Sequence, residues 1–548
     1  MKRRNTILVV FLVMMFVSSL FVSCSKSEST TTSGSTTAAS TETTTSTKES
    51  APKAATIEPR GGKTLTVAFS ENVVNIDPLD QSNMIGSLQN NMYIEPLVFY
   101  SSVNGYSPCL ATSWESNEDG TEWTFHLREG VYFHNGEEFD SADCAVTFQR
   151  ILDNLTTLNN PLQYWPNLIG YEVIDKYTFK IILSEPQSAI LASLYLTPIL
   201  PNEAFEEYGT KLWTDQHLVG TGPWKFVQWI DGQYVEFEKN ENYWDKENYD
   251  PYYDRIIFRY TKEPASTVAS HIAGDIQLNI SSGGINPDIL PLYNGTEDII
   301  NMISFDSGQE MYVGFSCKEG SPFADKKVRE AFDYAIDRQA IIDNIIGSGK
   351  VPNGVITDTI EGYNPDLQGY TYDPEKARQL LAESSYNGEE ITLMCNTSLL
   401  KGEAIMLAMS EMLNAVGFNT NAQVVEVAVL SNVRKTGDFD VFAVAWMFAA
   451  ADPGQFLTLR VMNDGHHTFY KNEELNDLIA QSNREMDPEK RAALVRECAR
   501  IMDEEHAPYS AFAQLRITYA ADKGIVGLEG LYDDWFTLKY VDFDPTQV

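Results

Sequence analysis

The chain has 548 residues, with 40 Lys or Arg against 77 Asp or Glu and a formal net charge of −37. So acidic a chain has no broad basic surface for a phosphate backbone, which argues against nucleic-acid binding. The length is sufficient for two or three structural units with substantial hydrophobic cores.

The start of the chain has the pattern of a secretory signal. Basic residues at positions 2–4 are followed by an apolar run over 7–17 and by small residues before Cys24. This run is shorter than the roughly 20 apolar residues that span a bilayer. The pattern therefore predicts a signal peptide over residues 1–23.

Cys24 stands at the predicted cleavage point, and Leu20–Cys24 resembles a bacterial lipobox, in which the cysteine is lipid-modified. Phe21 stands where that pattern usually has Leu, and an ordinary signal peptide with an accidental cysteine is the alternative. Residues 25–55 are mostly Ser, Thr and Ala with no aromatic residue. Such a segment cannot bury enough apolar surface to fold, so 24–61 is predicted to be a lipid anchor and a solvated tether at the cell envelope.

The first half of the folded region is predicted to be rich in strands. Alternating residues predict a strand over 63–69 and a hairpin in which 123–128 turns at Glu129-Gly130 and returns over 131–134. The other expected elements are a helix over 85–93, a helix over 142–152 capped by Ser141, and strands over 177–183, 224–229 and 234–239.

The second half alternates helices and strands, which indicates an α/β unit. A long helix is expected over 325–346, with Arg329 and Arg338 in ion pairs on its surface. Further expected helices cover 374–383 (capped by Asp373), 403–416, 473–483 and 489–504, with strands over 391–395, 421–427 and 441–446.

The remaining cysteines and histidines give no metal or cofactor pattern. Apart from Cys24 there are five cysteines, widely spaced and odd in number, which is neither a disulfide framework nor a zinc spacing. A single bridge is left open. His466-His467 is the one adjacent histidine pair, and a solvated loop is favoured there over a metal site. No metal and no cofactor are expected.

Several segments, taken together and in order, resemble the bacterial extracellular solute-binding proteins of family 5, which serve peptide and nickel ABC importers. The segments are Pro108–Trp114 with Trp123–Arg128, Val219–Trp224 with Asn242–Trp244, Asp325–Arg329 with Tyr334–Arg338, and Tyr372–Ala377. In physical terms most of them are scaffold, with large aromatic bodies for core packing and glycines at Gly220 and Gly222 for turn geometry.

The resemblance implies an α/β, two-lobed periplasmic-binding-protein fold of type II. Two crossover strands, near 311–316 and 510–519, would serve as hinges. The implied bounds are 62–305 plus 510–548 for the first lobe, with an inserted subdomain over 97–204, and 306–509 for the second lobe.

The informative departure from the family pattern is at Ala449. Peptide-binding relatives usually place an aspartate three residues after the tryptophan that corresponds to Trp446, and its carboxylate pairs with the peptide α-ammonium. Asp452 matches a later aspartate that more often shapes a turn. Three explanations are open: a ligand without a free amine, another acid such as Asp452 or one in loop 80–84, or a shifted alignment.

Further candidate ligand-binding residues follow from the same comparison. Trp446 and Phe448 offer flat apolar faces on one side of a strand, with core packing as the alternative. Ser82 and Met84 match a ligand-facing loop of peptide-binding relatives.

The sequence thus predicts a monomeric lipoprotein that captures a small solute by lobe closure and delivers it to an ABC permease driven by a separate ATPase. An oligopeptide is the expected solute, with an oligosaccharide or another amine-free ligand as the alternative. Presentation of the ligand to a sensory receptor is the other open role. An enzyme is not expected, because no nucleophile elbow or metalloprotease motif is present.

Overall fold

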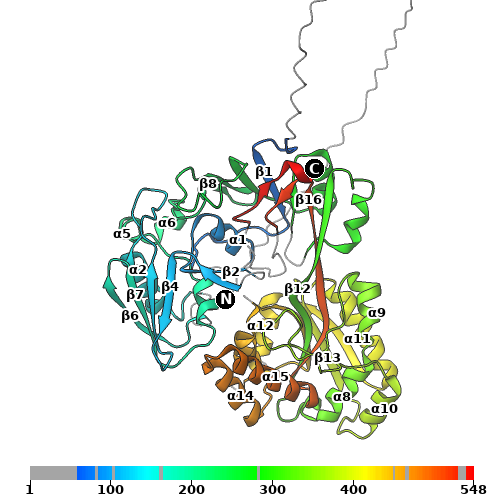
Figure 1. Ribbon diagram of the computed structural model, residues 1–548. Helices are drawn as coiled ribbons and strands as arrows, with labels where there is room; N and C mark the ends of the chain where they lie inside the picture. The colour runs from blue at the N-terminus through cyan, green and yellow to red at the C-terminus, as the bar shows by residue number, and fades with distance from the viewer. Residues whose placement is uncertain are drawn as a thin grey trace, which may run out of the picture. The chain divides into compact units, whose positions relative to one another are not determined.

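Two long paired strands organise the structure, a computed structural model. β12 (Ile300–Phe315) and β16 (Tyr509–Asp522) run antiparallel and side by side (Figure 1). The structure describes residues 58–80, 84–101, 105–158, 164–280, 284–448, 451–462, 468–528 and 538–548, without the side chains of 84 and 85.

β12 and β16 lie inside a ten-stranded mixed sheet of order β14-β13-β15-β12-β16-β11-β1-β10-β9-β8. The other strands of this sheet are β1 (Thr64–Phe69), β8 (Trp224–Ile230), β9 (Tyr234–Lys239), β10 (Arg255–Tyr260), β11 (Leu278–Asn279), β13 (Glu390–Asn396), β14 (Asn419–Val425) and β15 (Val441–Met447).

β12 and β16 run from one hydrophobic core to another, and the buried apolar residues form separate cores at the two ends of this strand pair. The molecule therefore has two lobes. The core of the first lobe gathers residues between 65 and 280 and from 517 onward, and two clusters of the second lobe gather residues between 311 and 515. Thr56–Val548 is nevertheless one compact unit, so contacts between the lobes belong to its tertiary structure.

The first lobe carries a second sheet. Its strands, in the order β4-β5-β7-β6, are β4 (Ala111–Ser116), β5 (Glu122–Leu127), β6 (Leu168–Asp175) and β7 (Thr178–Leu183). Two small two-stranded ladders accompany it, formed by β2 (Val98–Ser101) with β3 (Gly105–Pro108) and by β17 (Ile525–Val526) with β18 (Asp542–Phe543).

The helices cover the sheets in each lobe (Figure 1). In the first lobe they are α1 (Met84–Tyr93), α2 (Ser141–Asp153), α4 (Ile190–Tyr195), α5 (Asn202–Tyr208), α6 (Lys211–Thr214), α7 (Pro264–Ala273), η1 (Pro287–Tyr293) and η6 (Pro545–Gln547). In the second they are η2 (Pro322–Ala324), α8 (Lys326–Ala335), α9 (Arg338–Ile341), η3 (Ile342–Ile346), α10 (Pro374–Ala382), α11 (Gly402–Val416), α12 (Val427–Thr436), α13 (Gly454–Phe456), η5 (Leu457–Val461), α14 (Glu473–Arg484) and α15 (Pro488–Glu504).

Most of the predicted elements are confirmed within one or two residues at their ends, and Asp373 caps α10 by accepting from the amide of Lys376 at 3.0 Å. Helices α4, α5, α6, α7 and α12 were not predicted. All five cysteines beyond Cys24 are free thiols.

The hairpin predicted over 123–134 is wrong. β5 pairs with β4 and β7, and the amide of Leu127 bonds the carbonyl of Tyr177 across that ladder. Residues 131–133 instead bond to residues 137–139, with an isolated bridge between Tyr132 and Glu138, and Val131 and Phe133 are buried. The alternation over 131–134 therefore does not belong to a strand that pairs with β5.

The predicted cap of α2 is also wrong. Asp140 is the N-cap and accepts from the amide of Ala142 at 2.7 Å, while the Asp143 carboxylate accepts from the amide of Asp140 at 2.8 Å. This is a capping box built from two aspartates. The Ser141 hydroxyl instead donates to the carbonyl of Asp175 at 2.8 Å and so ties the helix to β6.

The helix predicted over 325–346 is broken after Ala335, where Ile336 is extended with φ −93° and ψ 116°. Arg338 is buried there and donates to Asp333 Oδ1 at 2.7 Å and to Ser510 Oγ at 2.7 Å. Arg329 is buried as well and donates to the carbonyls of His506 and Phe323. The expected ion pairs on the helix surface are therefore wrong.

Gly220 and Gly222 are required for close packing of the backbone, and neither has a positive φ. A Cβ atom on Gly220 would lie 2.0 Å from the Tyr93 carbonyl oxygen, and one on Gly222 would lie 2.7 Å from that of Met92. Only glycine permits this approach of the loop to the end of α1.

Candidate functional site

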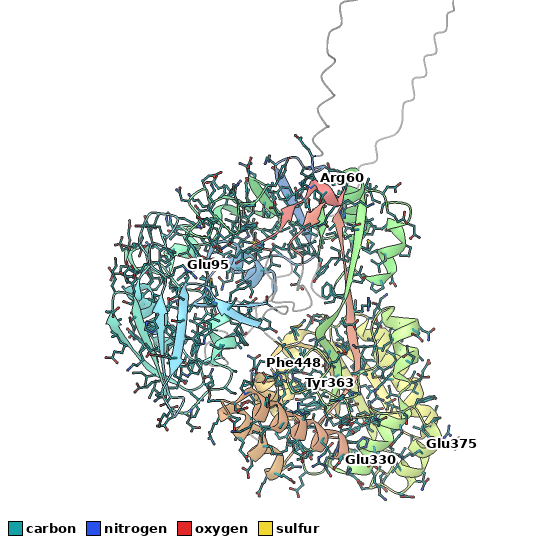
Figure 2. The ribbon with its side chains drawn as sticks, viewed as in Figure 1. Arg60, Glu95, Glu330, Tyr363, Glu375 and Phe448 are labelled. Carbon is teal, nitrogen blue, oxygen red and sulfur yellow. The ribbon has the colours of Figure 1, made fainter. Side chains whose placement is uncertain are left out.

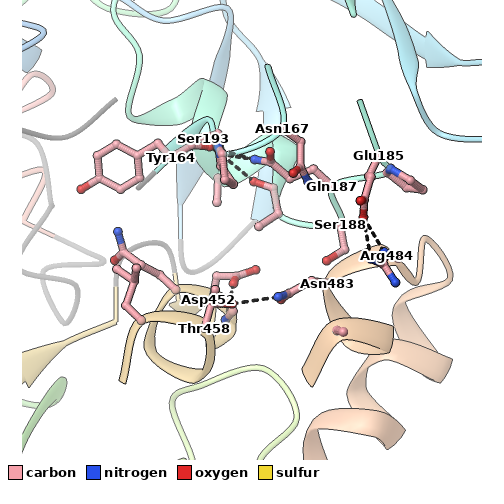
Figure 3. Close-up of a pocket in the computed structure, with 18 of the residues that line it drawn as sticks. Tyr164, Asn167, Glu185, Gln187, Ser188, Ser193, Asp452, Thr458, Asn483 and Arg484 are labelled. Carbon is pink, nitrogen blue, oxygen red and sulfur yellow. Dashed lines mark hydrogen bonds and ion pairs between the residues drawn. The ribbon is translucent and has the colours of Figure 1, made fainter. Parts of the chain in front are cut away.

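The candidate site is a pocket between the two lobes, referred to below as the outer pocket (Figure 3). Its volume is about 280 Å³. The first lobe contributes the segments 164–167 and 185–196, and the second lobe contributes residues of 452–462 and of α14. A pocket shared by two lobes changes shape when the lobes move, which suits capture of a ligand by closure.

Contacts across the edge of the outer pocket join the lobes, and they are called the rim contact here. The amide of Ser188 donates to the carbonyl of Asn483 at 2.9 Å, and its hydroxyl donates to the carbonyl of Ser482 at 3.0 Å. Arg484 pairs with Glu185 at 2.6 Å (Figure 3). The rim contact lies away from the crossover strands, so it forms only when the lobes meet.

The wall from the first lobe is fixed by its own hydrogen bonds. Gln187 Nε2 donates to the Tyr164 carbonyl at 2.8 Å and to Ser193 Oγ at 2.8 Å. The Ser193 hydroxyl in turn donates to the Tyr164 carbonyl at 2.6 Å. Since the carbonyl only accepts, the orientation of the Gln187 amide is determined.

Asp452 lines the wall from the second lobe, but its carboxylate is already occupied. It pairs with Arg491 at 2.8 Å and accepts from the amide of Gly454 at 2.7 Å. Arg491 also pairs with Glu361 at 2.6 Å. Burial alone would lower the pKa of Arg491, but the charges of Asp452 and Glu361 raise it overall.

The backbone before Asp452 is unusual. Ala451 has φ 56°, in the left-handed region that non-glycine residues rarely adopt. Strained residues of this kind occur often at ligand sites. In the first lobe, burial and then the charge of Asp452 raise the pKa of the Tyr106 hydroxyl.

Neither of the two predicted aromatic residues lines the outer pocket. Phe448 is buried, with its ring centroid 5.2 Å from that of Phe456, and Figure 2 places it in the second lobe. Trp446 is half-buried, 6.0 Å from Phe456 by ring centroids, with the Arg460 guanidinium 4.6 Å from its ring. Both rings contact Phe456 and belong to the core packing of the second lobe.

The other predicted site residues fall outside what the structure describes. Ala449, Ser82 and Cys24 are among the residues left undescribed, as is His466-His467, and only the backbone of Met84 is described. Within the described ranges no group of three metal-binding side chains gathers. No helix there has the length and apolarity to cross a membrane.

A second cavity of about 270 Å³, called the hinge pocket here, lies beside the crossover strands. Asn279, Thr261 and Ser70 line it from the first lobe and Ser398 and Ala445 from the second. Of the residues that line the two pockets, only Asp452 was predicted from the sequence, because the others come from segments far apart in the chain and carry no motif.

Comparison with known proteins agrees with this geometry. Residues 105–466 match the family model described as bacterial extracellular solute-binding proteins, family 5 Middle. Heme-binding protein A of Haemophilus influenzae is 29% identical over 76% of this chain and 80% of its own length. Glutathione-binding protein GsiB of Shigella dysenteriae serotype 1 is 25% identical over 88% of this chain and 94% of its own.

A solved structure shows the same fold. The periplasmic binding protein DppA of Helicobacter pylori, in complex with the peptide STSA, superposes with a TM-score of 0.73 at 23% identity. The match covers 88% of this chain and 98% of that one. The two lobes and their crossover strands are thus those of a type II periplasmic binding protein.

Proposed function

The chain belongs to the bacterial extracellular solute-binding proteins of family 5, and we propose that it captures a small solute between its lobes and delivers it to an ABC permease. The observation that carries this proposal is the outer pocket, which both lobes line and the rim contact closes. Ligand contacts to both lobes favour the closed form, because a ligand shifts the equilibrium toward the state it binds better.

We place this function at the outer face of a membrane. Residues 1–23 serve as signal peptide, and lipid on Cys24 with the tether to residue 61 holds the protein near its permease. The lobes move as 62–305 with 510–548, including the subdomain 97–204, against 306–509. The protein acts as a monomer, and a separate ATPase supplies the energy for transport.

An oligopeptide is the proposed solute, with an oligosaccharide or another amine-free ligand as the alternative. The peptide complex of the DppA structure supports the first. The pairing of Asp452 with Arg491 speaks against Asp452 as a replacement for the missing carboxylate at Ala449. A peptide bound here is therefore oriented mainly by contacts other than a salt bridge from Asp452 to its amine.

A thermal-shift screen of tripeptides against cello- and xylo-oligosaccharides tests the proposal. A solute at 100 times its dissociation constant adds about 2.7 kcal/mol to the stability of the folded state and so raises the unfolding midpoint. We expect tripeptides to do so. If no solute of either class stabilises the protein, the capture role is wrong. If free-amine tripeptides stabilise it strongly and Ala449→Asp adds nothing, the interpretation of Ala449 is wrong.

The rim contact predicts a moderate effect of charge reversal on affinity. Arg484→Glu places two carboxylates at the contact, but both side chains are about half exposed, at 53% and 50%. A pair so exposed is worth at most about 1 kcal/mol. The dissociation constant of the best solute of the screen is expected to rise up to about fivefold by calorimetry, and Glu185→Arg in the same chain should restore it.

Arg500→Glu is the matched control, since among the described residues Arg500 pairs with Glu497 and Glu504 of its own helix α15 and with no acid of the other lobe. It should leave the dissociation constant unchanged. An equal effect of Arg484→Glu and Arg500→Glu would show that the rim contact plays no part in closure.

A further inference from the structure

The outer pocket carries information about the chemistry of the solute. We propose that it is a selectivity site for one uncharged, apolar group of the solute, of the size of a large amino-acid side chain. The proposal rests on the capture function above and deepens it, because it states which part of a ligand the pocket accepts.

The charged groups that line the pocket are paired within the protein. Among the lining residues that the structure describes, the charged ones are Asp452, Glu185 and Arg484. Asp452 pairs with Arg491, which it shares with Glu361, and Glu185 pairs with Arg484 across the rim. An anionic group of the solute would therefore lose its hydration without gaining an unpaired positive charge, and a cationic group would meet only carboxylates that already have an arginine partner, which disfavours both.

Several polar groups of the walls are engaged by other groups of the protein. Gln187 and Ser193 bond to each other and to the Tyr164 carbonyl, and Asn483 Nδ2 donates to Thr458 Oγ1 at 2.8 Å. Gln187 Oε1 has no partner among the described residues, and the atom is itself buried. The bonded groups therefore shape the walls and offer few further hydrogen bonds to a solute.

What the walls do offer is apolar surface from both lobes. Small and flexible side chains face the cavity, so a bulky apolar group can fill it and methionine can adapt to its shape. They are Ala189, Ala192 and Leu196 from the first lobe and Leu459, Met462 and Ala480 from the second.

The volume sets the size of the group. At about 280 Å³ the cavity is near the lower end of the roughly 300–1,000 Å³ that whole small-molecule sites occupy. It therefore holds one group of a larger solute. In a peptide this group is a side chain such as that of leucine, phenylalanine or methionine.

The test uses the mature chain and five tripeptides that differ only in the central residue: Ala-Leu-Ala, Ala-Phe-Ala, Ala-Asn-Ala, Ala-Asp-Ala and Ala-Lys-Ala. Leucine, asparagine and aspartate branch alike, so shape is matched while polarity and charge change. By calorimetry we expect the leucine and phenylalanine peptides to bind about tenfold or more tightly than the other three.

The variant Ala480→Phe fills the pocket from α14, where Ala480 is half-buried, and is expected to abolish the preference. Gln481→Phe, at the next and exposed position of the same helix, is the control and should keep it. Melting curves of both variants establish that they are folded.

The outcomes separate the two proposals. Equal binding of all five peptides, tighter binding of the aspartate or lysine peptide, or an unchanged preference in Ala480→Phe would overturn the selectivity site and leave the capture role intact. Binding of oligosaccharides and of none of the peptides would also overturn the selectivity site and leave the capture role intact. Failure of every peptide and oligosaccharide to bind would overturn the capture role itself.

Discussion

Replacement of Asp333 by alanine is expected to lower the free energy of unfolding by about 3–5 kcal/mol, as when one partner is removed from a buried ion pair. Asp333 is fully buried and accepts from Arg338 Nη2 at 2.7 Å, from His506 Nδ1 at 2.8 Å and from Ser510 Oγ. Without this carboxylate the buried Arg338 guanidinium loses the acid with which it pairs. Urea titration at neutral pH measures the change.

Asp337→Ala is the matched control, four residues further along the chain. It removes the same charge but only an N-cap, in which Asp337 accepts from the amide of Ala340 at 2.9 Å. Loss of such a cap costs about 1 kcal/mol. If both variants lowered the free energy of unfolding by the same amount, the view that Asp333 anchors α8 to the crossover strand β16 would be contradicted.

Replacement of Lys539 by methionine is expected to cost a similar 3–5 kcal/mol. Lys539 and Glu95 form an ion pair deep in the first lobe, with side chains 3% and 1% exposed. Figure 2 shows Glu95 in that lobe. Glu95 also accepts from Thr221 Oγ1 at 2.7 Å and from Trp244 Nε1 at 2.7 Å. The variant keeps these bonds but leaves the carboxylate without its cation.

The pH dependence gives this prediction a second readout. Burial alone would raise the pKa of Glu95, but the charge of Lys539 and the hydrogen bonds to the carboxylate lower it overall. In the wild type this stability is therefore present above the ordinary carboxyl pKa of about 4.3 and is lost as the pH falls through the lower folded value. In Lys539→Met burial prevails and the pKa of Glu95 is raised, so the variant gains stability as the pH falls from neutral.

Thermal melts should therefore show that the difference in unfolding midpoint between the wild type and Lys539→Met becomes smaller from about pH 7 to pH 5. Lys326→Met provides the control, because Lys326 pairs with Glu505 on the surface at 3.2 Å and with both side chains at least 40% exposed. It should cost less than about 1 kcal/mol at either pH. A Lys539→Met deficit as small as that of Lys326→Met, or one that grows on acidification, would contradict the prediction.

The buried networks around Asp333 and Glu95 depend on contacts that a local sequence pattern does not predict. The apolar period over 325–346 predicts one helix, whereas the segment forms α8, α9 and η3, whose buried apolar residues belong to one core cluster. The period does not reveal that Arg338 must reach β16, a strand some 170 residues away, which breaks the helix at Ile336. A long-range hydrogen bond has no local signature.

The predicted pairing of β5 was wrong for the same reason. The alternation over 123–128 correctly predicts β5, but the partner of a strand depends on residues that only the fold brings near. β5 lies between β4 and β7, whereas the segment that follows its turn packs Val131 and Phe133 into the core and does not pair with β5. Local pattern determines how a strand alternates and not which strand it meets.

The candidate site was predictable only in part. The segment from Trp446 to Asp452 was singled out by resemblance, and Asp452 does line the outer pocket. Gln187, Ser188 and Ala480 could not have been found, since small or amide side chains in helices and loops carry no chemical motif. The meeting of the two lobes brings these residues to one pocket.

The sequence by itself determined the α/β class, most helices and strands, and the family, because periodicity, capping residues and ordered motifs are local properties of the chain. Only the tertiary structure decided the strand order, the buried ion pairs of Arg338 and Lys539, and the pairing of Asp452 with Arg491 at the outer pocket. The physical reason is that burial and the pairing of charges depend on segments distant in sequence, and folding alone brings those together.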